Sequence, residues 1–252
     1  MTPSLLAGAR VYLTEVDPGT GPLAGNVGLH VGDDPLLVRR RRKALARLIG
    51  RDVVWLGQTH STRVEVVARV EGAPRLAGAL SSLEAPAPGE WGPVGADGIV
   101  IDARGWAGAP GLAVQTADCL PVVLAADGGR VVAAVHAGRR GLLGGILTRA
   151  VDAIRELADG PINALIGPAI CGSCYEVPVQ MVRDSEAVMP GIGAVTSWGT
   201  PSLDLPRAAA ALLADAGVYV EIDPRCTLED GGLFSYRADP ACGRQALIIV
   251  PA

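Results

Sequence analysis

The most regular hydrophobic pattern lies in the middle third of the chain. Two runs, 120–125 and 130–136, are apolar at nearly every position and have the length of strands. Two further segments, 98–102 and 111–115, precede them and also fit strands. Continuously apolar strands indicate a sheet that is covered on both faces.

Apolar residues at helical spacing predict several helices. The best defined runs from about Pro35 to Ile49 and ends before Gly50. Asp33 or Asp34 can cap its N-terminus. Its basic run, 39–43, points in several directions around the helix, which favours a solvated face over a phosphate site. Further helices are predicted over 142–158, 177–187 and 205–216.

Together these elements predict an α/β (mixed α+β) fold. The strands expected outside the middle third are 10–15, 52–56, 62–67, 164–167, 219–222 and 245–250. We expect one layered domain over residues 1–252, with a central mixed β-sheet and flanking helices. The segment 71–95 is rich in Pro, Gly and Ala without periodicity, which predicts a flexible loop.

Composition and charge exclude several classes of protein. The 252 residues are 49% hydrophobic and 19% charged, which excludes a disordered chain. A net charge of -4 provides no field that attracts polyanions, so nucleic acid is not an expected partner. No apolar run approaches the ~18–20 residues that span a bilayer, so a membrane is not expected either. Five cysteines, an odd number, favour free thiols in the cytoplasm, and we expect a monomer or weak homo-oligomer.

Candidate chemistry begins with a cysteine and a histidine at the outer ends of a predicted hairpin. If Asp127 and Gly128 are the central residues of the turn, Cys119 lies directly opposite His136. If Gly128 and its neighbouring glycine form the turn, Cys119 faces Gly138 and becomes a diagonal neighbour of His136. Either register keeps the thiol and the imidazole close together.

A thiolate and neutral imidazoles are good zinc ligands. A third protein ligand, with water in the fourth position, would make an open catalytic site. The chain has only three histidines, and His60, at the end of a predicted strand, is the candidate for the third ligand. The alternative is a buried free cysteine beside core histidines, since local sequence does not show how His60 packs.

Seven blocks of the chain match, in order, the motifs of a known family. They are GQTH (57–60), ADG (96–98), TADCLPV (116–122), HAGRRG (136–141), IGPAI (166–170), CYEV (174–177) and FSYR (234–237). On these motifs the chain resembles the YfiH-like, laccase-domain family over nearly its whole length from Asn26 onward. The TADC and HAG blocks together are highly specific. The resemblance implies the YfiH-like fold.

Members of this family are described as zinc-binding purine nucleoside phosphorylases that also deaminate adenosine, and an older label calls them copper polyphenol oxidases. The resemblance implies that His60, Cys119 and His136 hold zinc, with copper belonging to the older label. It also implies purine nucleosides and phosphate as substrates: adenosine, inosine, guanosine and methylthioadenosine. Cys119, His136 and Asp118 are then the candidate catalytic residues, with Asp118 orienting a histidine or carrying a proton.

Six residues are candidates for binding nucleoside and phosphate. They are Asn26, Arg42, Arg139, Arg140, Tyr236 and Arg237. Arg139 and Arg140 precede a predicted helix, so their guanidinium groups could converge on phosphate. The family usually has Trp where this chain has Arg139, and Asn where it has Arg41. Both departures add positive charge beside the expected substrate site.

Two other classes of function use the same residues. A metal-free hydrolase would employ Cys119 as nucleophile and His136 as base, for example as an amidase acting on cell-wall precursors. A non-catalytic protein would bind nucleosides without turnover. A multicopper oxidase needs many more imidazoles than three.

The remaining cysteines give a weaker signal. Cys171 and Cys174 form a C-x-x-C motif, but no second C-x-x-C or nearby histidine completes a four-ligand site. We therefore expect unpaired structural thiols there. Cys226 and Cys242 are too isolated in the sequence to interpret.

Overall fold

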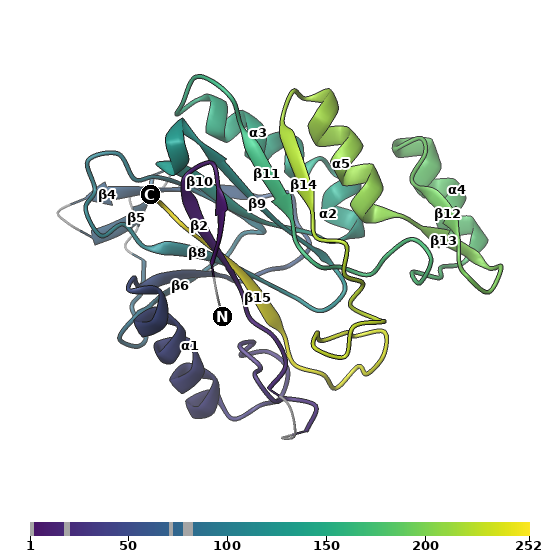
Figure 1. Cartoon of the computed structure of the whole chain (residues 1–252), viewed down its shortest axis with the longest axis horizontal. Coiled ribbons are helices and arrows are strands. Elements are labelled where there is room, and N and C mark those ends of the chain that lie inside the picture. The colour runs from purple at the N-terminus through teal and green to yellow at the C-terminus, as the bar shows by residue number, and fades with distance from the viewer. Residues whose placement is uncertain (1–2, 18–20, 71–72, 78–82) are drawn as a thin grey trace.

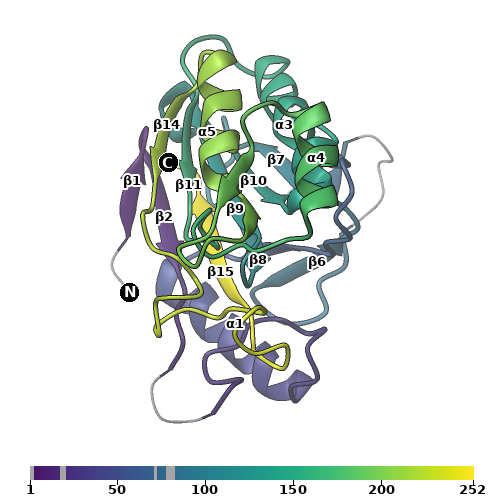
Figure 2. The ribbon, with the colours of Figure 1, turned by 90° about the vertical axis from the view of Figure 1, so that its right-hand side faces the viewer.

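Two β-sheets lie face to face at the centre of the protein (Figures 1 and 2). A computed structural model describes residues 3–17, 21–70, 73–77 and 83–252. The first sheet has the spatial order β1 (Ser4–Leu6), β2 (Ala9–Leu13), β15 (Gln245–Val250), β8 (Gly111–Thr116), β3 (Val53–Leu56) and β6 (Glu90–Val94). The second has the order β14 (Tyr219–Ile222), β11 (Asn163–Ile166), β9 (Leu120–Ala126), β10 (Val131–Ala137), β7 (Gly98–Asp102), β4 (Val64–Val70) and β5 (Ala73–Leu76). A separate pair consists of β12 (Gly193–Val195) and β13 (Pro201–Leu203).

Helices cover the two outer faces of the paired sheets. They are α1 (Pro35–Ile49), α2 (Arg139–Leu143), α3 (Ile146–Arg155), α4 (Val179–Val188) and α5 (Leu205–Asp215). In Figure 1, α1 lies below the sheets, and α3 and α5 lie above them. Among the described residues, no helix combines the length and the apolar content that crossing a bilayer would need.

Strands β9 and β10 contribute to two hydrophobic cores at once. Val122 and Leu124 pack with α3 and α5, whereas Val123 and Ala125 face the other sheet. Successive side chains of a strand point to opposite faces, so an apolar residue is needed at every position. The expectation of a sheet covered on both faces is therefore confirmed.

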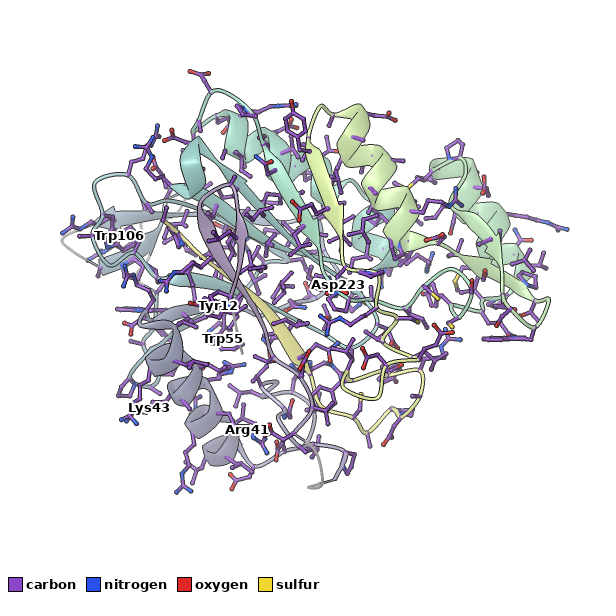
Figure 3. The ribbon with its side chains drawn as sticks, viewed as in Figure 1. Tyr12, Arg41, Lys43, Trp55, Trp106 and Asp223 are labelled. Atoms are coloured by element: carbon purple, nitrogen blue, oxygen red, sulfur yellow. The ribbon has the colours of Figure 1, made fainter. Side chains whose placement is uncertain are left out.

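Helix α1 packs on the outer face of the first sheet. Asp34 caps it by accepting a hydrogen bond from the Leu36 amide at 2.8 Å, and Gly50 ends it with a φ of 71°. Tyr12 and Trp55 lie between the helix and the sheet, among buried aliphatic residues (Figure 3). These contacts confirm the predicted bounds and capping of this helix.

Arg42 corrects the expected solvated face of the basic run. Its side chain is buried, its guanidinium lies 3.9 Å above the Trp55 ring, and it donates to Glu90 at 2.6 Å. Burial lowers the pKa of Arg42 to about 10, although Glu90 favours its charged form. One arginine of the run thus belongs to the core of the protein.

Two features of the sheets differ from the prediction. The single central sheet is in fact two sheets, because the first and last strands of the chain join β3 and β8 in a sheet of their own. Strands β5 and β6 occupy parts of segment 71–95, so the prediction of a loop there is wrong for those parts. Residues 71–72 and 78–82 of that segment lie outside the described residues.

The predicted hairpin and the helix after it also differ in detail. His136 pairs with Pro121, which is the second of the two expected registers, and Cys119 is therefore a diagonal neighbour of His136. The predicted helix 142–158 is divided into α2 and α3. Gly145, with a φ of 87°, separates them because a left-handed residue interrupts a right-handed helix.

Candidate active site

His60, Cys119 and His136 meet at one end of the paired sheets. The thiol sulfur of Cys119 lies 3.7 Å from Nε2 of His60, and the two imidazole rings have centroids 4.7 Å apart at 82°. The potential ligand atoms of all three residues lie within 4.8 Å of one another. His136 is 3% exposed and His60 is exposed, so the cluster opens to solvent on one side.

The backbone brings these side chains together at some conformational cost. His136 is near the end of β10, and Cys119 directly precedes β9. His60 and Asp118 have φ values of 61° and 89°, in the left-handed region that side chains disfavour. Gly138 lies against the cluster, where a Cβ would be 2.6 Å from Cδ2 of His60 and 3.1 Å from the Cys119 sulfur. Only glycine leaves room for this approach.

Asp97 holds both histidines, a role that the sequence alone does not indicate. Its fully buried carboxylate accepts hydrogen bonds from the amides of Thr59, His60 and Ser61 at 2.7–3.1 Å. It also accepts from Nδ1 of His136 at 2.8 Å, which leaves Nε2 of His136 for the cluster. Asp97 therefore fixes the backbone of one histidine and the tautomer of the other.

Charge in the cluster is shared between thiol and imidazole. Burial raises the pKa of Cys119, but hydrogen bonds with His136 and His60 outweigh it and lower the pKa to about 6. Burial lowers the pKa of His136, but its bonds to Asp97 and Cys119 raise it to about 9. The preferred metal-free state at neutral pH is thus a thiolate beside an imidazolium, from which a metal ion would displace the imidazolium proton.

The donor set fits one metal ion. A tetrahedral zinc with Zn–S of about 2.3 Å and Zn–N of about 2.0–2.1 Å places sulfur and nitrogen about 3.6 Å apart. The Cys119–His60 separation of 3.7 Å matches this value. Three protein ligands leave the fourth position open, as in catalytic zinc sites.

The cluster forms part of the wall of a cavity of about 500 Å³. This volume lies in the range of small-molecule sites. The wall also carries three guanidinium groups and two phenol rings, from Arg139, Arg237, Arg244, Tyr175 and Tyr236. The cavity therefore combines cations for an anionic group with aromatic faces for a flat ring.

The candidate substrate residues fall into two groups. Arg139, Tyr236 and Arg237 line the cavity. Arg140 is exposed on α2 and does not contribute to the lining. Arg42 and Asn26 are buried in the framework beside it rather than in the described wall. The roles of all six in substrate binding remain predictions.

Asp118 joins three loops beside the cluster. One carboxylate oxygen accepts from the Thr227 hydroxyl and the other from the Arg237 amide, both at 2.7 Å. Its carbonyl oxygen accepts from the Ile170 amide at 3.0 Å. These contacts position the loops that carry the cavity wall, and its catalytic role stays a prediction.

Several residues of the wall were not predicted from the sequence. They include His30, Gln58, Gln115, Tyr175 and Arg244. The pKa of His30 is lowered by burial and by the nearby charges of Arg244 and Arg42, which favours a neutral ring. Tyr175 and Gln58 lie inside two of the matched motifs, so the motifs held the only available signal for them.

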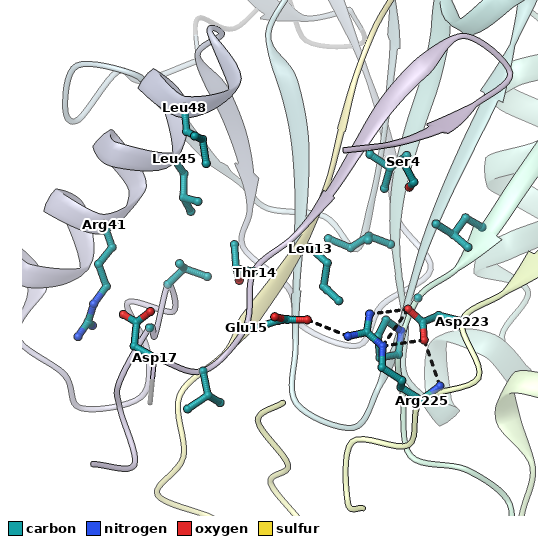
Figure 4. A pocket seen from close by; sticks show the side chains of 18 of the residues that line it. Ser4, Leu13, Thr14, Glu15, Asp17, Arg41, Leu45, Leu48, Asp223 and Arg225 are labelled. Carbon is teal, nitrogen blue, oxygen red and sulfur yellow. Dashed lines mark hydrogen bonds and ion pairs between the residues drawn. The ribbon is translucent and has the colours of Figure 1, made fainter. Parts of the chain in front are cut away.

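A larger cavity, of about 850 Å³, lies between α1 and β2 (Figure 4). Aliphatic side chains such as Leu13 and Leu45 line it, together with an ion-paired group in which Arg225 contacts Glu15 at 2.8 Å and Asp223 at 2.7 Å. Its described lining contains neither histidine nor cysteine. The smaller cavity is therefore the candidate active site.

Comparisons with known proteins show which family and which solved structures the chain is similar to. The profile of the family described as multi-copper polyphenol oxidoreductase laccase matches residues 20–252. A purine nucleoside phosphorylase of Streptomyces griseus is 43% identical over 88% of this chain and 84% of its own. A purine nucleoside phosphorylase of Deinococcus radiodurans is 34% identical over 87% of this chain and 79% of its own. A Neisseria meningitidis protein of solved structure has a TM-score of 0.78 and 35% identity over 97% of this chain and 95% of its own. The solved structure of the YfiH protein of Bacillus licheniformis has a TM-score of 0.74 and 29% identity over 97% of this chain and 92% of its own.

Proposed function

Because this chain belongs to the multi-copper polyphenol oxidoreductase laccase family and is similar to proteins named purine nucleoside phosphorylases, we propose that it is a zinc-dependent purine nucleoside phosphorylase. The resemblance inferred from the motifs is confirmed. The observation that carries the proposal is the His60–Cys119–His136 cluster, which shares a cavity with three guanidinium groups.

His60, Cys119 and His136 would be the protein ligands of the metal ion. One thiolate and two imidazoles suit zinc, whereas a multicopper centre needs more imidazoles than the three histidines of this chain. When bound, zinc would act as a Lewis acid and lower the pKa of a water molecule towards about 7. Asp97 keeps Nε2 of His136 available for it.

Phosphorolysis requires an anion beside C1′ of the nucleoside. A phosphate oxygen bonds to C1′ while the C1′–N bond breaks, and the purine leaves with the electron pair and takes up a proton. Arg139 suits the anion best, because its guanidinium makes no hydrogen bond or ion pair within the described part of the chain. Arg244 is held over the Tyr236 ring at 5.8 Å, and Arg237 over the Tyr175 ring at 5.3 Å, so each of these two cations already has an aromatic partner in the cavity wall.

Adenosine deamination is the second activity that the site supports. In this reaction a water oxygen bonds to C6 of the purine, and the amino group leaves as ammonia. The exposed side of the cluster favours it, because a substrate can approach the metal ligands from the cavity. Asp118, half-buried in the same wall, is the proposed proton carrier.

The competing hydrolase would use the same thiol without metal. The lowered pKa of Cys119 gives it a thiolate at neutral pH, which is what a nucleophile requires. Metal-free activity with an acyl group trapped on Cys119 would favour that alternative, including an amidase acting on cell-wall precursors. Nucleoside binding without any product would favour a non-catalytic binding protein.

The test uses metal-quantified protein with inosine or adenosine, with and without phosphate. We expect chromatography to show phosphate-dependent formation of ribose 1-phosphate together with hypoxanthine or adenine. We expect Cys119→Ala to lose this activity. Arg139→Ala should raise the KM for phosphate at least about 10-fold, since a charge-assisted hydrogen bond is worth roughly 1.5–3 kcal/mol. Arg149→Ala, at an exposed position of α3, is the matched control. Undiminished activity in Cys119→Ala would refute the proposal.

The proposed setting of the enzyme follows from its thiols. All five cysteines are free, which supports the cytoplasm as its compartment. The expected partners are purine nucleosides and phosphate, in keeping with the names of the related proteins. A monomeric or weakly associated state stays a prediction.

A further inference from the structure

A second group of potential metal ligands lies outside the candidate active site. It consists of Cys171, Cys174, Cys226 and Glu229, whose potential ligand atoms all lie within 4.8 Å of one another. The sequence alone predicts unpaired thiols for the C-x-x-C motif and gives no signal for Cys226. The structure brings two further potential ligands to this motif, because Cys226 and Glu229, in a C-x-x-E motif on a distant loop, lie beside it.

The two motifs adopt similar turns that face each other. The Cys174 amide donates to the Cys171 carbonyl at 3.0 Å, and the Glu229 amide donates to the Cys226 carbonyl at 3.1 Å. The loops are joined by a parallel bridge between Ala169 and Cys226, and the Cys171 amide donates to the Cys226 sulfur at 3.4 Å. Each turn therefore presents its two side chains, spaced three residues apart, to one common point.

We propose that these four residues bind one structural zinc ion. Three thiolates and a carboxylate make a complete tetrahedral set, and thiolates select zinc over the hard cations magnesium and calcium. Around tetrahedral zinc, sulfurs lie about 3.8 Å from one another and about 3.5 Å from a carboxylate oxygen, so donors within 4.8 Å of one another need to contract by about 1.3 Å at most. The two residues between Cys171 and Cys174 match the C-x₂₋₄-C spacing of structural zinc sites.

Two of the three thiols are buried beside each other. Cys174 is 3% exposed and Cys226 is 5% exposed, and they share a small apolar cluster with Ile170. Cys171 is half-buried and Glu229 is exposed, so the four donor groups extend from this cluster to the surface.

The ion would fix part of the cavity wall. Ile170 directly precedes the first turn and Tyr175 directly follows it, and both line the candidate active site. Thr227, inside the second turn, donates to the Asp118 carboxylate at 2.7 Å. A zinc ion that ties the two turns together would therefore position residues of the wall without contacting substrate.

Metal analysis of Cys119→Ala tests the second site separately from the first. In protein purified under reducing conditions, we expect about two zinc equivalents per wild-type chain and about one in Cys119→Ala. Cys226→Ser should also retain about one, and the double variant should retain none. Cys242→Ser removes another buried cysteine outside the group and should retain about two. Absence of zinc from the wild-type protein would overturn both assignments. Zinc present in wild type but absent from Cys119→Ala would overturn only the second site.

A spectroscopic titration covers the case in which Cys226→Ser fails to fold. Cobalt(II) added to reduced, metal-free Cys119→Ala should give the intense sulfur-to-cobalt charge-transfer bands and visible bands of a tetrahedral thiolate site. Glu229→Gln should shift the visible bands while leaving the charge-transfer bands. Absence of these bands, or a disulfide among the three cysteines in protein isolated without reductant, would overturn the proposal.

Discussion

Replacement of Asp97 by asparagine removes one charge and one acceptor at the centre of the candidate active site. One carboxylate oxygen accepts from the His60 amide and from Nδ1 of His136, and the other accepts from the Ser61 amide and hydroxyl. An asparagine amide group must direct its NH₂ against one of these sets. At least one buried N–H then faces another donor, whichever way the amide is turned.

The expected loss follows from these contacts. Each buried donor left without an acceptor costs about 1–3 kcal/mol, and breaking a buried charged pair costs about 3–5 kcal/mol. We therefore expect Asp97→Asn to lower the free energy of unfolding of the metal-free protein by about 3–5 kcal/mol. For a chain of this size each kcal/mol corresponds to about 2–4 °C, so Tm should fall by roughly 10 °C. Loss of the partner of His136 should weaken zinc binding about 10–100-fold.

The assay combines thermal unfolding of metal-free protein with zinc competition against a chromophoric chelator. Removing the metal first separates the intrinsic loss from the stabilisation that a bound ion adds. Asp102→Asn is the matched control, at the other end of β7, where the carboxylate pairs with Arg104 near the surface. That change should cost under about 1 kcal/mol and leave zinc affinity unaltered. An Asp97→Asn protein that unfolds within about 1 kcal/mol of wild type would refute the reasoning.

Three other changes give contrasting expectations. Gly138→Ala places a methyl group against the imidazole and the thiol of the cluster. Because it disturbs the position of two ligands, it should weaken zinc binding at least about 10-fold in the same competition assay. Gly95→Ala is the control, because a Cβ there meets nothing within 4 Å, and it should bind zinc normally. Arg42→Ala takes the 2.6 Å partner from buried Glu90 and leaves it with Arg39 at 3.2 Å. The change should lower the free energy of unfolding in urea by about 3 kcal/mol, the lower end of the cost of breaking a buried pair, and a loss below about 1 kcal/mol would contradict a desolvated pair. Burial raises the pKa of Asp223, but hydrogen bonds and charge from Arg225 lower it by more, so the net pKa lies below the usual 3.8. The carboxylate therefore stabilises the fold above pH 3.8, and this stabilisation is lost as the pH falls through the lowered pKa. Asp223→Asn should therefore be less stable than wild type by about 1 kcal/mol at pH 7, and a difference in Tm that persists at low pH would contradict this assignment.

The predictable part of the fold was the part with unambiguous periodicity. The apolar runs of β9 and β10 indicated a doubly covered sheet, and Asp34 and Gly50 marked the ends of α1. The pairing of the strands into two sheets depends on contacts between distant segments, which periodicity does not encode. Arg42 shows the same limit, because only its packing on Trp55 and pairing with a carboxylate from β6 explain its burial.

The candidate site likewise has a part that local sequence predicts and a part that depends on contacts between distant segments. Cys119 and His136 were expected to meet because a hairpin joins them, whereas His60 was a candidate chosen by its chemistry and by family resemblance. The supporting role of Asp97 rests on hydrogen bonds to a loop some 37 residues earlier in the chain. Similarly, Glu229 is an ordinary acidic residue in the sequence, and only the fold places it beside the cysteines of a distant loop.

The alternation along β10 restricts where this chain can change in length. His136 shares its side of the strand with Val132 and Ala134, towards the opposing sheet, while Val131 and Val135 face the helices. Deleting or inserting one residue within the strand would rotate the imidazole to the opposite side, among aliphatic groups beneath α3. We therefore expect natural insertions and deletions among relatives to avoid this strand and to accumulate in the connecting loops.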